Sequence, residues 1–194
     1  KVKEQISGYN IRSRGLYSRI FRPAITPDFL YTRLMVQMPL DAEIIDSYNL
    51  GEEAEVNLFR MKNDVKILYH ITPKEFTLPE EKYEILDIAR GLLAKHQPAK
   101  EEFLDPEKIR KGFFNIGKGL LQELAEHRKI KLSYRELEDL AWILVRYTVG
   151  FGLIEVLLRD TRIQDITING PIGESCMYIV HQDYDECSTN IIPN

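Results

Sequence analysis

The sequence predicts an α+β fold, in which a hairpin and a three-helix layer precede the start of a small mixed α/β module. A hairpin signal occurs near residues 55–71, and Asp165–Asn169 alternates polar and apolar residues with the period of a half-buried strand. Between them lie three amphipathic segments with helix-start signals. The 194 residues are 44% hydrophobic, which is enough for a core, and contain no apolar run long enough to cross a bilayer.

The first strands are expected to form a hairpin. Glu55–Met61 and Val65–Ile71 flank Lys62–Asp64, where Asn and Asp tolerate the left-handed conformations of a tight turn. Pro73 then closes the second strand. The Met-rich segment Asp28–Leu40 fits either a short helix or a strand, because its periodicity does not decide between them.

Three helices are expected next. Thr77–Glu80 has the pattern of a capping box before a helix that runs to about Lys95, and Asp105-Pro106 begins the second helix. Ser133–Glu136 caps the third, which carries Trp142 as a packing anchor against a neighbouring element. The second helix is expected to bury a stripe of apolar residues at helical spacing: Ile109, Phe113, Ile116, Leu120 and Leu124.

The stretch Gly112–Gly119 nearly matches a phosphate-binding loop, but we predict no such function for it. A true loop of that kind follows a buried strand, whereas an amphipathic segment precedes this one and its apolar stripe continues through it. Gly119 also stands where a hydroxyl would bind Mg²⁺. We therefore expect no ATPase turnover and no tight binding of Mg-ATP by this chain alone, and Lys118→Ala should leave its folding and function almost unchanged.

A second pattern concerns the residues around a predicted turn at 182–185. His181, Asp183, Asp185 and Cys187 recur at every second residue, as metal ligands on one strand face would. The turn interrupts that face, so we expect a solvated hairpin turn and no metal site. Cys176 and Cys187 are expected as free thiols, and no pattern of nucleophilic catalysis predicts a catalytic residue.

Charge is distributed unevenly along the chain. The net charge of −4 is made up of +5 over residues 1–40, −7 over residues 41–108 and −2 over residues 109–194. The predicted organisation is a basic N-terminal arm over 1–40, a helix-rich N-terminal domain over 41–149 and the start of a second α/β module over 150–194. The arm interleaves arginine with aromatic residues, which suits contact with the acidic body, with a neighbouring subunit or with an anionic surface.

The C-terminal stretch resembles a known family. Two glycines open a short helix, expected over Leu153–Leu158, and a strand ending in a turn and a second strand over Tyr178–His181 follow. This arrangement resembles the N-terminal module of the type II and type IV secretion and pilus-assembly ATPases, most closely their archaeal branch. The residues of the pattern up to the turn are Gly150, Gly152, Ile154, Glu155, Leu157, Leu158, Asp160, Asp165, Ile166, Ile168, Asn169 and Gly170.

The resemblance implies the N-terminal regulatory and docking region of a hexameric ATPase that couples ATP hydrolysis to protein export or filament assembly. It implies ATP and Mg²⁺ for the parent protein and no cofactor in this chain. The implied partners are the chain's own C-terminal motor domain, further copies in a hexamer and an inner-membrane platform protein, with no nucleic acid. The implied location is cytoplasmic, peripheral at the membrane face. Because the sequence stops at Asn194, before such a motor domain would begin, the chain alone is expected to be inactive.

The resemblance also implies roles for individual residues. Arg159 and Arg162 are candidates for contact with the nucleotide, by location alone. The glycine pair is expected to include a backbone conformation that other residues rarely adopt. The residues of the family pattern with expected structural roles are Gly150, Gly152, Asp165, Asn169 and Gly170. The residues of the C-terminal strands that are expected in the core are Ile166, Ile168, Ile179 and Ile191.

Two alternatives to this function stay open. One is a stand-alone adaptor that binds a protein through the acidic residues 41–108. The other is a nucleic-acid-binding module that uses the basic arm, for which binding should depend steeply on salt.

Overall fold

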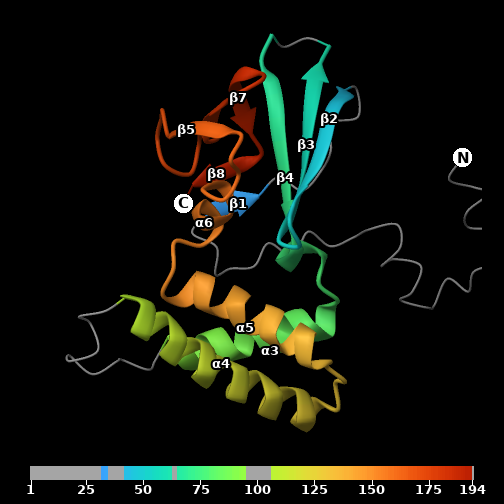
Figure 1. The fold of residues 1–194 in the computed structure, drawn as a ribbon, viewed down its shortest axis with the longest axis vertical. Coiled ribbons are helices and arrows are strands. Elements are labelled where there is room, and N and C mark those ends of the chain that lie inside the picture. Colours follow the sequence, from blue (N-terminus) through green and yellow to red (C-terminus); the bar gives the residue numbers. More distant parts are fainter. Residues whose placement is uncertain (1–31, 35–41, 63–64, 95–105, 194) are drawn as a thin grey trace, which may run out of the picture.

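A computed structural model describes residues 32–34, 42–62, 65–94 and 106–193, which fold into two lobes (Figure 1). The sheet lobe contains the strands and the short helix α6 (Leu153–Leu157), and the helical lobe contains α3, α4 and α5. Both helices and strands are well represented, so the predicted α+β class is confirmed. Most of the predicted basic arm over 1–40, including its contacts with the acidic body, lies outside the described residues.

Six of the described strands form one mixed sheet in the order β2-β3-β4-β7-β6-β5. The predicted hairpin is present as β3 (Ala54–Met61) and β4 (Ile67–Pro73), and β2 (Ala42–Leu50) pairs antiparallel with β3. The C-terminal strands are β5 (Ile163–Thr167), β6 (Tyr178–His181) and β7 (Asp185–Thr189), joined antiparallel. A separate ribbon pairs β1 (Thr32–Leu34) with β8 (Ile191–Pro193).

The sheet joins segments that the sequence analysis placed in two different domains. Strand β4 pairs in parallel with β7, from Ile67 opposite Cys187 to Tyr69 opposite Thr189. Beyond β7, the amide side chain of Asn190 continues the pairing, because it donates to Ile71 O at 2.9 Å and accepts from Ile71 N at 3.0 Å. The hairpin and the residues after Gly150 therefore share one sheet, and the helical lobe is inserted between them in the sequence.

The hairpin and the C-terminal strands share one hydrophobic core in the sheet lobe. Alternate residues of β3 and β4 are fully buried against the apolar face of α6 and the C-terminal strands. Ile179 and Ile191 are buried as predicted, Ile166 is partly buried, and Ile168 is exposed because it lies beyond the end of β5. The expectation that Ile168 belongs to the core was therefore wrong.

The helical lobe has a core of its own. Helices α3 (Glu80–Leu93), α4 (Pro106–Arg128) and α5 (Tyr134–Thr148) bury one apolar face each. The predicted capping box at Ser133 is present, with Glu136 N donating to the Ser133 hydroxyl and the Glu136 side chain accepting from Ser133 N. Trp142 stacks on Phe114 of α4 with ring centroids 4.5 Å apart, as a packing anchor would.

Two predicted details of these helices were wrong. Thr77 does not cap α3: a 3₁₀ turn, η1 (Lys74–Thr77), intervenes, the Thr77 hydroxyl donates to Lys74 O, and Pro79 is the N-cap residue. On α4 Phe113 is buried as predicted, and Ile109, Leu120 and Leu124 are partly buried against this core, but Ile116 is 47% exposed and does not belong to it. The residues that α4 buries are Phe113, Gly117, Leu121 and Ala125.

The near-match to a phosphate-binding loop lies inside α4, as predicted. Its Lys118 forms an ion pair with Glu138 of α5 at 2.9 Å and lies over the ring of Tyr134. Backbone amides in the middle of a helix are already bonded within it, so they cannot surround a phosphate. Among the described helices, none combines the length and the apolar character that crossing a membrane requires.

Candidate functional site

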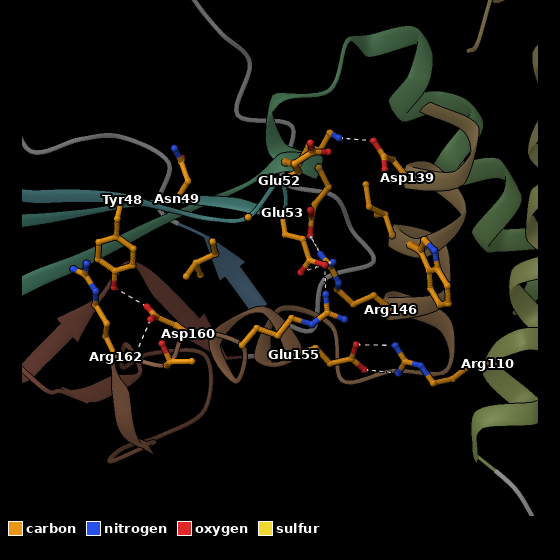
Figure 2. A pocket seen from close by; sticks show the side chains of 18 residues that line it. Tyr48, Asn49, Glu52, Glu53, Arg110, Asp139, Arg146, Glu155, Asp160 and Arg162 are labelled. Carbon is orange, nitrogen blue, oxygen red and sulfur yellow. Dashed lines mark hydrogen bonds and ion pairs between the residues drawn. The ribbon is translucent and has the colours of Figure 1, made fainter. Parts of the chain in front are cut away.

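A cleft of about 770 Å³ lies where the two lobes meet (Figure 2). Its sheet-lobe wall comes from the end of β2, the β2–β3 turn and the segment around α6, and its other wall comes from η1, α4 and α5. The lining side chains are largely charged, with basic and acidic groups facing one another. The basic residues are Lys74, Arg110, Arg146, Arg159 and Arg162, and the acidic ones are Glu52, Glu53, Glu75, Asp139, Glu155 and Asp160.

Arg146 of α5 is the most enclosed cation of this cleft. It is 5% exposed, and its guanidinium lies 3.1 Å from Glu53 Oε2 on the β2–β3 turn and 3.3 Å from Glu75 Oε1 on η1. Glu53 also binds Arg159 through its other oxygen, and Glu75 accepts from the Tyr147 hydroxyl. A buried charge is tolerated only when it is paired and hydrogen-bonded, so this cluster ties both lobes to one guanidinium.

A second ion pair crosses between the lobes near the glycine junction, which is the segment from Gly150 to Gly152 between α5 and α6. Arg110 of α4 donates to both carboxylate oxygens of Glu155 on α6, at 2.7 and 3.0 Å. Burial would raise the pKa of Glu155, but the Arg110 guanidinium and a hydrogen bond from Phe151 N outweigh it and lower that pKa. The bidentate geometry holds α6 against α4 in a fixed orientation.

The two glycines of this junction have different constraints. Gly152 has φ +58° and ψ −132°, a conformation that residues with a side chain rarely adopt, and it is the N-cap residue of α6. A Cβ at Gly150 would lie 2.7 Å from Arg146 O and would also collide with the Glu155 carboxylate. The prediction of a special backbone conformation at this pair is therefore confirmed at Gly152.

A hydrogen-bond chain closes the sheet end of the cleft. Buried Asp160 accepts at Oδ2 from the hydroxyls of Tyr48 and Tyr69, at 2.6 and 2.8 Å. Burial, reinforced by the Asp160 charge, raises the pKa of both phenols far above its usual value, so both stay protonated donors. His181 Nε2 lies 3.3 Å from Tyr48 Oη, and Arg162 lies 4.1 Å above the Tyr48 ring. This network joins four segments of the sheet lobe.

The structure brings together only some of the residues that the sequence analysis singled out. Arg159 and Arg162 both line the cleft; Arg159 pairs with Glu53, and Arg162 pairs with Asp46 at 3.0 Å. Asp165, Asn169 and Gly170 are exposed and do not line it. Asp165 lies within β5 and accepts a hydrogen bond from Ile166 N at 2.8 Å.

Sequence reasoning did not identify Glu53, Glu75 and Arg146 as site residues. Arg146 carried a usable signal, because it follows three apolar residues near the end of an amphipathic helix, where a charge has to find a partner. Glu53 and Glu75 carried none, since their role depends on how the lobes come together. Among the described residues, those of the cleft included, no group of three His, Cys, Asp or Glu side chains is arranged to hold a metal ion. Cys176 and Cys187 are free thiols.

Comparisons with known proteins add one archaeal relative. No family model and no solved structure matches the chain. An uncharacterized protein of Methanocaldococcus jannaschii is 26% identical over 191 residues, which is 98% of this chain and 65% of that protein. The chain thus spans about 65% of the length of this curated relative, and the similarity covers both lobes.

Proposed function

We propose that this chain is the N-terminal regulatory and docking region of a hexameric secretion or pilus-assembly ATPase. In this proposal the parent protein couples ATP hydrolysis to protein export or filament assembly at the cytoplasmic face of a membrane. The chain contributes a rigid two-lobed platform rather than the hydrolytic site. Its partners are the motor domain that follows it, further copies in the hexamer and a membrane platform protein.

The observation that carries the proposal is the unit that begins at the glycine junction. Gly152 has the positive φ expected of that junction, and the predicted helix, strand and hairpin follow as α6, β5, β6 and β7. The archaeal source of the relative and its greater length are compatible with the archaeal branch of the family and with a further domain. Arg159 and Arg162 line one cleft, so they remain the candidates for contact with a nucleotide held by the motor.

The structure bears on the adaptor alternative as well. Many acids of residues 41–108 are bound within the chain, since Asp46, Glu52 and Glu53 pair with arginines of later segments. Such acids offer less free negative charge to a protein partner than the sequence alone suggested. The nucleic-acid alternative depends on the basic arm, which lies largely outside the described residues.

The downstream coding sequence is the first test of this proposal. A motor domain of the RecA type should follow, and the full-length product should form hexamers and hydrolyse ATP, as measured by analytical ultracentrifugation and phosphate release. Removing residues 1–194 should impair assembly on the platform protein and leave the nucleotide-binding fold of the motor intact. Lys118→Ala in the full-length protein should leave turnover unchanged. A gene without a motor domain, or turnover that depends on Lys118, would overturn the proposal.

A further inference from the structure

Glu53 lies where two arginines from different elements converge inside the cleft. Its Oε2 is 3.1 Å from Arg146 Nη2 on α5, and its Oε1 binds Arg159, which follows α6. Guanidinium groups arranged around one planar or tetrahedral oxyanion are the usual means by which proteins hold carboxylates and phosphates. The Glu53 carboxylate thus occupies an oxyanion position formed by the protein's own chain (Figure 2).

The surroundings would keep this position intact if Glu53 left it. Arg146 is 5% exposed and keeps a second carboxylate partner in Glu75, 3.3 Å away, so its guanidinium stays in place. The carbonyl of Glu53 is held separately by Lys74 N at 2.8 Å. Only the Glu53 side chain has to rotate away, and about one-third of its surface is exposed.

We propose that the cleft is a binding site for a phosphate-bearing ligand with at least two negative charges, and that Glu53 occupies it in the free protein. A tethered carboxylate competes at an effective concentration on the order of millimolar, so an anion with one charge would not displace it. A polyphosphate or phosphate ester offers more charge and more acceptor oxygens to Arg146 and Arg159. The volume of about 770 Å³ leaves room for such a ligand.

Displacement of Glu53 would also break one of the two ion pairs that hold the β2–β3 turn to α5, the pair of Glu53 with Arg146. The turn would then be held by the Lys74–Glu53 backbone bond and by the exposed pair of Glu52 with Arg135. Ligand binding and the position of this turn are therefore coupled. This inference concerns the cleft of this chain alone and does not depend on the proposed motor.

The experiment measures binding of inorganic tripolyphosphate and of ATP to the chain at about 0.15 M ionic strength. Trp142 is the single tryptophan, lines the cleft and is 45% exposed, so its fluorescence reports binding directly, with calorimetry as a second readout. Glu53→Gln keeps the shape of the side chain and removes the competing charge. We expect this variant to bind tripolyphosphate about tenfold more tightly than the wild type, or better.

Matched variants separate this site from general charge effects. Glu84→Gln removes a negative charge that pairs with Arg128 outside the cleft, and this variant should bind as the wild type does. Adding Arg159→Gln to Glu53→Gln should abolish the gain, and Arg159 is exposed enough that this change leaves the fold intact. Equal affinities for ATP and tripolyphosphate would mean that the site recognises the phosphates alone. A higher affinity for ATP would mean that the nucleoside also contacts the protein. Either result supports the site. Equal affinity of wild type and Glu53→Gln, or a gain that survives Arg159→Gln, would overturn it.

Discussion

His181 shows how burial sets the charge of a single side chain. Its ring is almost completely buried, and burial lowers its pKa below the ordinary value of 6.5, outweighing the attraction of Asp160 and Asp183. Asp183 N donates to His181 Nδ1 at 3.2 Å, so the proton of the neutral ring sits on Nε2 and is donated to Tyr48. A second proton would remove the acceptor that the Asp183 amide uses.

The stability of the protein should therefore depend on pH through His181. Because the pKa is lower in the folded chain than in the unfolded one, the unfolded state binds more protons as pH falls below about 6.5. The stabilising contribution is present above about pH 6.5 and is lost as pH falls through the folded pKa. We expect the urea midpoint to drop between about pH 7.5 and 5, with a smaller drop for His181→Gln.

The matched control for this prediction is His127→Gln, because His127 is exposed near the end of α4. That variant should retain the wild-type pH dependence. If His181→Gln shows the same drop as the wild type, the pH dependence comes from other groups and the assignment to His181 is wrong.

At the scale of a single element, α4 shows what periodicity predicts and what it misses. The apolar spacing correctly predicted a helix that runs through Gly112–Gly119. It missed the centre of the buried face, where Gly117 lets α5 approach closely: a Cβ there would lie 2.9 Å from Leu144 Cδ2. Close packing at Gly117 turns Leu121 inward and Ile116 outward. A pattern based on large apolar residues gives a glycine contact no weight.

Two substitutions on α4 distinguish the observed face from the predicted one. Leu121 is fully buried, so Leu121→Ala should cost about 2–5 kcal/mol of unfolding free energy, through lost burial and the cavity left behind. Ile116→Ala should change it by no more than about 0.5 kcal/mol, since that side chain is half-exposed. Urea denaturation with a constant m-value measures both. Equal losses of unfolding free energy in the two variants would mean that the buried face of α4 lies between these positions, against the structure.

At the scale of the whole molecule, local signals predicted the elements and missed how they combine. The β3–β4 hairpin, the capped α5 and the glycine-led α6 each depend on neighbouring residues, and each was found. The parallel pairing of β4 with β7 joins residues that lie far apart in the sequence, and only the folded chain shows it. The cleft has the same origin: Arg159 and Arg162 line it, and Glu53 and Arg146 meet there only through the packing of the lobes.

The junction at Gly152 should determine how the two lobes are held together. The chain crosses from α5 to α6 there with φ +58°, and Gly152 N donates to Arg146 O at 3.0 Å, beside the guanidinium that ties the lobes. A β-branched side chain disfavours this conformation, and its Cβ would lie 3.2 Å from the Tyr147 ring. We expect Gly152→Val to destabilise the protein by on the order of 1–3 kcal/mol and to increase its radius of gyration in X-ray scattering.

Gly119→Ala provides the control for that experiment. Gly119 lies in α4 with open space around it, so a methyl group there should stabilise the helix by roughly 0.5–1 kcal/mol and leave the radius unchanged. Arg110 and Glu155 hold α6 against α4 independently of the backbone at Gly152. If that ion pair alone sets the lobe arrangement, Gly152→Val will lose stability with no change in the radius of gyration. An increase in radius in the valine variant alone would locate the constraint at the glycine junction.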